Sequence, residues 1–248
     1  MRNKLLRTSV VTSFVLLVAI GTAHQAIAQD AKTSYATRAP LDEYLMPDRA
    51  AEVALARSAA PKSISRDATI LVLGHKGYET AVQRKNGFVC MVGRGWGAAF
   101  DWAEFWNPKI RAAECLNPQA ARAMLPIDEL RARMVMAGRS KAEIESALKA
   151  AFESNRLPQL ESGAMSYMMS KSAYLTDQGS HTLPHVMFYT HVKTGEDWGS
   201  GAAGSPVMSS PYWFFSSKDK SQAKGLPPIL VFLVAVPNWS DGTPVSQR

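Results

Sequence analysis

The chain has few residues that bear distinctive chemistry. Its 248 residues include only two cysteines, Cys90 and Cys115. Neither lies near residue 28, the end of the signal peptide predicted below. Lipid attachment to a cysteine exposed by cleavage of that peptide is therefore excluded. No five basic residues follow one another, whereas nucleic-acid-binding proteins gather Lys and Arg on one face. The sequence also lacks the G-x-S-x-G elbow of serine hydrolases.

The first 28 residues have the three parts of a secretory signal peptide. They begin with Arg2, Lys4 and Arg7, continue with an apolar run over 10–20, and end in the small-x-small site at 26–28. The apolar run is shorter than the roughly 20 residues that a helix needs to cross a bilayer, which disfavours a retained anchor. We therefore predict a signal peptide over 1–28 and a periplasmic or secreted mature protein without stable membrane insertion.

The charge balance of the mature chain is moderate. The full chain has 28 Lys and Arg against 21 Asp and Glu, and removal of the three leader cations leaves 25 against 21. Because these cations are scattered, we expect no nucleic-acid partner.

The two cysteines are predicted to form a disulfide. An exported protein matures among oxidants, and an even number of cysteines fits one bridge. The alternative is a catalytic thiol with a histidine partner, which the sequence neither supports nor excludes.

Helices are marked by proline, glycine and capping signals. Pro47 suits a first helical turn, Gly138 suits a C-terminal position, and Ser140 with Glu143 forms a capping box. Residues 29–44 are polar without periodicity, so we predict a flexible lead-in there. The predicted helices cover residues 47–58, 96–106, 117–126, 126–137 and 140–154.

Strands are predicted on both sides of this helical block. Asn86-Gly87 is a strong hairpin signal, so we expect the first three strands to form an antiparallel meander. Alternation along the third strand places Cys90 inward, toward Cys115. Residues 229–236 are apolar throughout, which predicts a central strand covered on both faces. The predicted strands cover residues 69–73, 78–82, 88–92, 164–169, 186–191, 206–208, 212–215 and 229–236.

This order of elements predicts an α+β fold, with one domain over 45–248. An antiparallel sheet is built from the N- and C-terminal β segments, and the central helical block packs on one side of it.

Several short motifs lie along the mature chain, at 86–90, 105–108, 163–171, 184–187 and 239–244. Together they resemble a group of uncharacterised exported bacterial proteins, over about 45–244. The resemblance supports export and implies no activity, cofactor or catalytic residue.

The histidines suggest a possible metal site. His181, His185 and His191 lie close in sequence to Asp177 and Asp197, and exported zinc hydrolases use such ligands. Across a straight strand, His185 and His191 would lie roughly 20 Å apart, which is too far to share one ion. Only a turn before His185 would bring it to His181. The alternative is a structural role at the entrance of a strand.

Two further patterns are weaker. Residues 93–98 match the loose G-x-G-x-x-[G/A] dinucleotide pattern but lack a predicted parallel βαβ unit, so we expect no cofactor. Trp96, Trp102 and Trp106 are candidates for a ligand-stacking platform, although aromatic rings at helical spacing more often belong to a core.

No catalytic constellation in the sequence is well supported. We therefore expect an exported, water-soluble domain with a non-catalytic binding or envelope-associated role, whose partner is an unknown small molecule or envelope component. The alternative is a metal-assisted hydrolase that uses His181 and His185.

Overall fold

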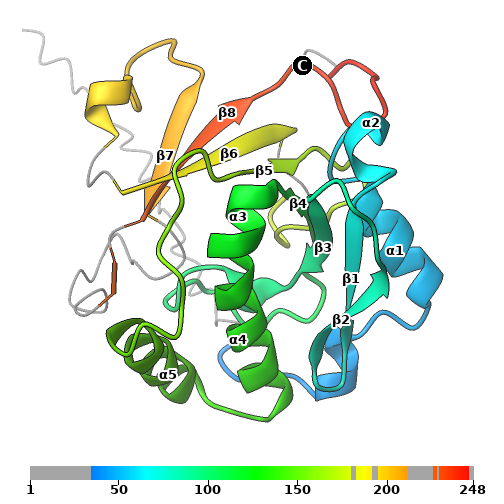
Figure 1. The fold of residues 1–248 in the computed structure, drawn as a ribbon, viewed down its shortest axis with the longest axis vertical. Coiled ribbons are helices and arrows are strands. Elements are labelled where there is room, and N and C mark those ends of the chain that lie inside the picture. Colours follow the sequence, from blue (N-terminus) through cyan, green and yellow to red (C-terminus); the bar gives the residue numbers. More distant parts are fainter. Residues whose placement is uncertain (1–34, 180–182, 192–194, 212–225, 228, 246–248) are drawn as a thin grey trace, which may run out of the picture. The chain divides into compact units, whose positions relative to one another are not determined.

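An eight-stranded mixed sheet is the framework of the protein, as the computed structural model in Figure 1 shows. The structure describes residues 35–179, 183–191, 195–211, 226–227 and 229–245, which all belong to one unit. The sheet order is β2-β1-β3-β4-β5-β6-β8-β7. The strands are β1 (Thr69–Gly74), β2 (Gly77–Val82), β3 (Val89–Gly93), β4 (Ala112–Leu116), β5 (Met165–Met168), β6 (His185–Thr190), β7 (Val207–Pro211) and β8 (Leu230–Ala235).

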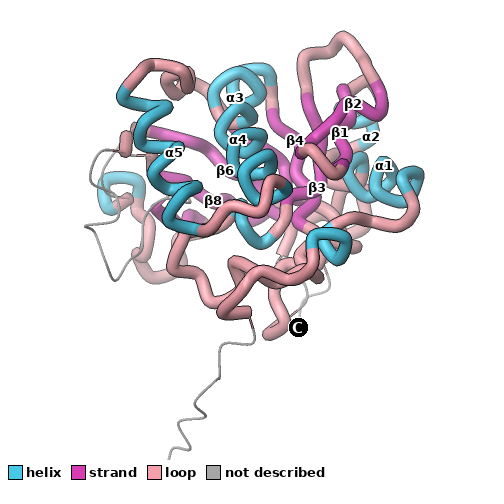
Figure 2. The backbone as a smooth tube through the Cα atoms, turned by 90° about the horizontal axis from the view of Figure 1, so that it is seen from below, coloured by secondary structure: helices cyan, strands magenta, loops and turns pink. Residues whose placement is uncertain are grey.

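Five α-helices and three short 3-10 helices accompany this sheet in the described residues. The predicted α+β class is confirmed, because the central helices α3 to α5 pack together on one face of a mostly antiparallel sheet (Figure 2). The helices are η1 (Leu41–Tyr44), α1 (Arg49–Arg57), α2 (Lys62–Ser65), η2 (Gly95–Gly97), α3 (Pro118–Ala123), α4 (Leu125–Met136), α5 (Lys141–Glu153) and η3 (Glu196–Trp198).

The predicted antiparallel meander of the first three strands is wrong. β3 does not pair with β2; it lies parallel to β1, with Ile70 opposite Cys90, and antiparallel to β4. The Asn86-Gly87 pair makes no hairpin, because Asn86 Nδ2 donates to Ile64 O and anchors the loop to α2. After β2 the chain thus passes the end of β1, and β3 pairs with β1 on the side opposite to β2.

The predicted helix over 96–106 is also wrong, and β4 was not foreseen. After η2 the chain continues in short turns, in which Trp102 N donates to Ala99 O and Phe105 N donates to Trp102 O. The β4 sequence, Ala-Ala-Glu-Cys-Leu, is rich in helix-forming residues, so pairing with β3 and β5 overrides local propensity there.

The capping signals of the helical block are confirmed. Ser140 and Glu143 form both hydrogen bonds of the capping box at the start of α5. Gly138 follows α4 with a φ of 79°, the left-handed conformation that glycine adopts without strain.

The flexible lead-in predicted over 29–44 is wrong for its described part. η1 occupies its last four residues, and the Tyr44 side chain is fully buried. The Tyr44 hydroxyl donates to Trp106 O at 2.9 Å and accepts from Ala39 N at 3.1 Å. This segment therefore belongs to the folded body.

Side chains of the sheet alternate between two cores. The helical face carries the larger core, to which Leu73, Leu116 and Tyr189 contribute together with α3, α4 and α5. The opposite face, which we call the disulfide face, carries a smaller core. That core consists of Ala56, Ala59, Ala60, Ala68, Ile70, Cys90, Val92, Ala113 and Cys115, and α1 covers it.

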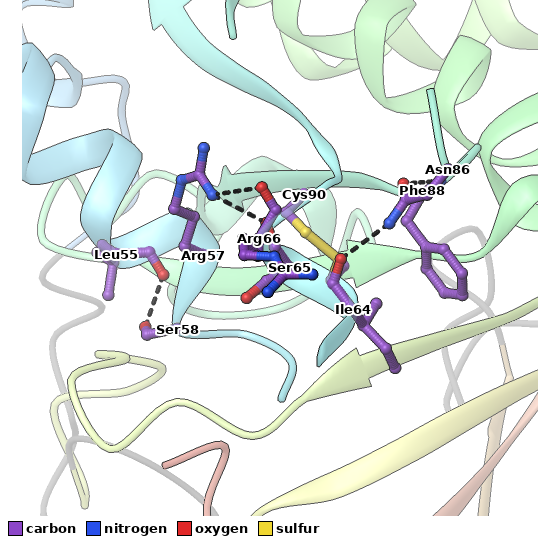
Figure 3. Close-up of a disulfide and its surroundings, with 10 residues drawn as sticks. Leu55, Arg57, Ser58, Ile64, Ser65, Arg66, Asn86, Phe88 and Cys90 are labelled. Atoms are coloured by element: carbon purple, nitrogen blue, oxygen red, sulfur yellow. Dashed lines mark hydrogen bonds between the residues drawn. A yellow bond between two sulfur atoms is a disulfide. The ribbon is translucent and has the colours of Figure 1, made fainter. Parts of the chain in front are cut away.

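The predicted disulfide is confirmed. Cys90 and Cys115 are directly opposite each other on β3 and β4, both are fully buried, and their sulfur atoms are bonded. Figure 3 shows the bridge beside the short segment that contains Ile64 and Ser65. The bond therefore joins β3 and β4, which are neighbours inside the sheet.

The C-terminal strands follow the prediction only in part. In β8, residues from Leu230 to Phe232 are buried, whereas Ala235 is exposed, so only the first half of the strand is covered on both faces. β8 is not central but lies next to the edge strand β7. The predicted strand at 212–215 lies outside the described residues. Among the residues that were placed, no helix has the length and hydrophobicity of a membrane span.

Candidate functional site

His185 occupies the start of β6 in a buried position, and burial lowers the pKa of its imidazole. His185 Nδ1 lies 2.8 Å from Leu183 O. Because a carbonyl oxygen only accepts, Nδ1 carries the proton, and the neutral ring then presents a lone pair at Nε2. A ring held in this way is competent to bind a metal ion.

The other proposed ligands do not gather around this ring in the described residues. His181 lies outside those residues, so the His181–His185 pair stays a prediction. His191 follows the far end of β6, where its Nε2 lies 3.3 Å from Leu160 O. No group of three potential metal ligands occurs in the described part of the chain.

Asp177 is held by its own hydrogen-bond network. Its carboxylate accepts from the hydroxyls of Tyr174 and Tyr35, the latter at 2.6 Å, and Lys109 Nζ lies 3.3 Å away. The hydroxyl of Tyr174, followed by that of Tyr35, lowers the pKa of Asp177 to about 2. The network fastens Tyr35 to the body of the protein, which is a structural role.

The stacking platform is wrong for Trp96 and Trp106, which are both buried. The Trp96 ring meets Tyr44 edge-on at 4.7 Å between centroids, and Trp106 meets Phe105 edge-on at 4.6 Å. Rings packed in this way are core residues with no face free for a ligand. Trp102 is half-buried, and a stacking role for it stays a prediction.

The glycine pattern at 93–98 serves backbone packing. A Cβ at Gly95 would lie 2.6 Å from Glu104 O, so only glycine permits this close approach of two segments. Arg94 turns inward, where its Nη2 donates to Glu52 Oε1 at 2.9 Å. These glycines follow β3, which lies inside the sheet.

Two buried carboxyl groups lie on the helical face, Glu114 on β4 and Asp128 on α4. Glu114 Oε1 accepts from the Tyr189 hydroxyl at 2.7 Å, and that hydroxyl lies 3.0 Å from Ser166 Oγ. Burial raises the pKa of Glu114. Burial, and then the nearby charge of Glu114, raises the pKa of Asp128 well above its usual value. Folding therefore shifts both groups toward the protonated form relative to the unfolded chain.

These two carboxyls predict a stability that falls as the pH rises. A carboxyl whose pKa is raised by folding stabilises the native state most below its unfolded pKa, about 4, and loses that contribution as the pH rises through its folded value. We expect Asp128→Asn to raise the free energy of unfolding at pH 8, because the amide is neutral at every pH and no buried carboxyl then has to ionise.

Urea unfolding of the wild type and of Asp128→Asn between pH 5 and 8 measures this difference. The gain should shrink toward pH 5, whereas the exposed control Glu153→Gln should change little at any pH. An Asp128→Asn gain that is equal at both ends of the range would contradict the buried titration.

The exposed large hydrophobic residues of the described chain fall in one short stretch. They are Leu183, Phe188, Trp198 and Met208. Strand pairing shows what lies around Phe188. Val186, Val234 and Val207 lie side by side across β6, β8 and β7.

The next row on the same face of the sheet is aromatic. Phe188 pairs with Phe232, and the Trp198 ring of η3 stacks on Phe232 with centroids 4.5 Å apart. Trp198 remains 54% exposed and Phe188 39% exposed. We call the surface formed by Val186, Phe188, Trp198 and Val234, around the buried Phe232, the open face.

The open face continues the disulfide face of the sheet. Cys115 on β4 pairs with Tyr167 on β5, and Tyr167 pairs with Val186 on β6, so all three point the same way. α1 covers this face over β1, β3 and β4. Over β6 and β8, Trp198 is the aromatic cover that the described residues provide.

The sequence contained a signal for this surface that we did not use. Val186 and Phe188 alternate with Met187 and Tyr189, so β6 is apolar on both faces. Only one of these faces has helices to cover it in the described structure, where Met187 and Tyr189 join the larger core.

Comparisons with known proteins found no match among family models, curated proteins or solved structures. The function is therefore inferred from the residues of this chain alone.

Proposed function

We propose that the mature chain is an exported, non-catalytic binding domain that acts in the periplasm or outside the cell. It binds its partner, a component of the cell envelope or another molecule of the same compartment, through the open face. Proteins rarely expose contiguous apolar surface without an interaction that covers it.

The observation that carries the proposal is the position of Trp198. Its ring is held flat on Phe232, so it is already ordered in the free protein, yet 54% of its surface stays in water. Aromatic side chains with few rotatable bonds lose little entropy on binding and dominate binding energies at interfaces. Phe188, on the neighbouring strand, extends the same surface.

Export is supported by two independent features. The leader over 1–28 has the three parts of a signal peptide. The buried disulfide suits an oxidising compartment, because cytosolic thiols are kept reduced. We expect the mature protein in the periplasmic or extracellular fraction to begin at Gln29, which mass spectrometry of the intact protein measures.

Photo-crosslinking in living cells tests the binding surface. A photoreactive phenylalanine at position 188 should give a defined adduct, whereas the same group at the exposed Glu153, on α5, should not. Adducts at neither position, or equal adducts at both, would refute binding through the open face. The molar mass of the adduct identifies the class of the partner.

The alternative function, a metal-assisted hydrolase, keeps one supporting observation. The protonated Nδ1 of His185 leaves Nε2 as a possible ligand atom. Metal analysis of mature protein decides: one zinc per chain that is lost in His185→Ala supports this alternative, and no bound metal ends it.

A further inference from the structure

We propose that the partner of the open face is a second copy of this chain, bound face to face around a twofold axis. This inference rests on the proposed function, since it names the occupant of the same surface. Apolar contact alone would not choose between a second copy and another protein. The charges on the two sides of the open face make that choice.

One side of the face is basic. α2 and the loop between β2 and β3 lie against each other there, because Asn86 Nδ2 donates to Ile64 O. Ile64 and Phe88 both pack against the disulfide core, which places this side on the same face of the sheet. Asp67 is the exposed carboxylate here, and it pairs with its neighbour Arg66. The exposed cations of this basic flank are Lys62, Arg66, Arg84 and Lys85.

In the described residues, the other side of the face is acidic. Glu196 and Asp197 precede Trp198 in η3, and both are exposed. η3 is fixed over β8 and β7 by the stacking of Trp198 on Phe232 and by the contact of Ser200 Oγ with Ser209 Oγ at 2.6 Å. This acidic flank is therefore held in place beside the apolar surface.

The two flanks lie at opposite ends of the surface that the disulfide face and the open face form together. The sheet order puts β4, β5 and β6 between β3 and β8. With neighbouring strands about 4.8 Å apart, roughly 20 Å separates the flanks. A twofold axis that lies in the interface and runs along the strands exchanges these two ends. Each acidic flank then meets the basic flank of the other copy, and the apolar surfaces meet between them.

The other in-plane orientation of the axis is disfavoured. A twofold axis that runs across the strands would place acidic flank against acidic flank and basic against basic, which is repulsive. The charge pattern thus selects one arrangement of two sheets packed face to face.

Analytical ultracentrifugation of the mature, oxidised protein tests the dimer. We expect a concentration-dependent dimer that weakens as salt is added, because salt screens the contacts between flanks. Trp198→Asp should raise the dimer dissociation constant at least about 30-fold, as loss of an interfacial aromatic anchor does. Met208→Asp is the matched control: Met208 is equally exposed, at 53%, but it pairs with Leu233 on the helical face. It should leave the dimer intact.

Charge reversal tests the orientation. The variant Glu196→Lys/Asp197→Lys and the variant Lys62→Glu/Lys85→Glu should each dimerise about tenfold more weakly than the wild type. When mixed, the two variants should form a heterodimer. One contact then joins the two reversed flanks and the other joins the two unchanged flanks, so opposite charges meet in both. Circular dichroism of each variant confirms that it is folded.

The outcomes separate this inference from the proposed function. A wild-type protein that stays monomeric, together with an adduct to a different molecule at position 188, would overturn the dimer and keep the binding face. A monomer without an adduct would overturn both. A dimer that Trp198→Asp leaves unchanged would overturn this interface.

Discussion

Replacement of Arg94 by methionine is expected to lower the free energy of unfolding by about 3–5 kcal/mol, the usual effect of removing one partner from a buried ion pair. The Arg94 and Glu52 side chains are almost fully buried, with Arg94 Nη2 2.9 Å from Glu52 Oε1. Whole domains are stable by only about 5–15 kcal/mol, so this loss is a large share.

The pair is costly to break because it joins four segments of the chain. Arg94 Nε donates to Tyr44 O at 2.7 Å, and its Nη1 donates to Val92 O. Glu52 Oε1 also accepts from Leu73 N at 3.2 Å. Without the guanidinium, the Glu52 carboxylate would remain in the interior without its cation, and the Tyr44 carbonyl would lose its donor.

Urea unfolding of Arg94→Met, Glu52→Leu and the double variant measures the effect and its coupling. Each single variant leaves one charge behind, whereas the double variant leaves none. The double variant should therefore be destabilised by less than the sum of the single variants. Additive losses would show that the two charges do not depend on each other in the folded protein. Arg139→Met, an exposed arginine paired with Glu143, is the control and should change stability by less than about 1 kcal/mol.

Local signals predicted the helical block well. The capping box at Ser140 and the glycine after α4 act within a few residues of the chain, and both are found in the structure. Such features depend on hydrogen bonds between near neighbours, so the sequence is enough to locate them.

Strand order was not predictable in the same way. Asn86-Gly87 is a good hairpin signal, but the pairing of β3 with both β1 and β4 outweighs it. Parallel contact of Ile70 with Cys90 joins residues 20 positions apart in the sequence, and no local pattern encodes it. The dinucleotide pattern at 93–98 was set aside because the strand before it was expected to pair in an antiparallel meander, and that pairing is incorrect. The burial of Arg94 gives this segment a structural role instead.

The candidate site was missed because exposure is a property of the assembled sheet. The predictions concentrated on residue types, namely histidine and tryptophan, and chose Trp96 and Trp106, which are buried. Trp198 is exposed because η3 lays its ring over Phe232, a contact between residues 34 positions apart. Only the tertiary arrangement distinguishes the exposed Trp198 from the buried Trp96 and Trp106.

Removal of the disulfide is expected to lower the free energy of unfolding by about 3.5 kcal/mol in the chain-entropy model for a loop of this length. The bond closes a loop between residues 25 positions apart. Cys90→Ala/Cys115→Ala is the suitable variant, because both positions are fully buried and a serine hydroxyl there would need a hydrogen-bond partner. Loss of the buried sulfur atoms beneath α1 adds a packing cost to the entropic one.

Reductant supplies the matched measurement. Dithiothreitol should shift the urea midpoint of the wild type toward that of the double alanine variant and should leave the variant itself unchanged. Equal midpoints for oxidised and reduced wild type would show that the bridge contributes nothing to stability. Because β3 and β4 also pair along five residues around the bridge, the reduced protein should still fold, with a lower midpoint and the same sheet content by circular dichroism. The chain kept under reducing conditions would then be folded but weakened, and it would reach its full stability only under oxidising conditions.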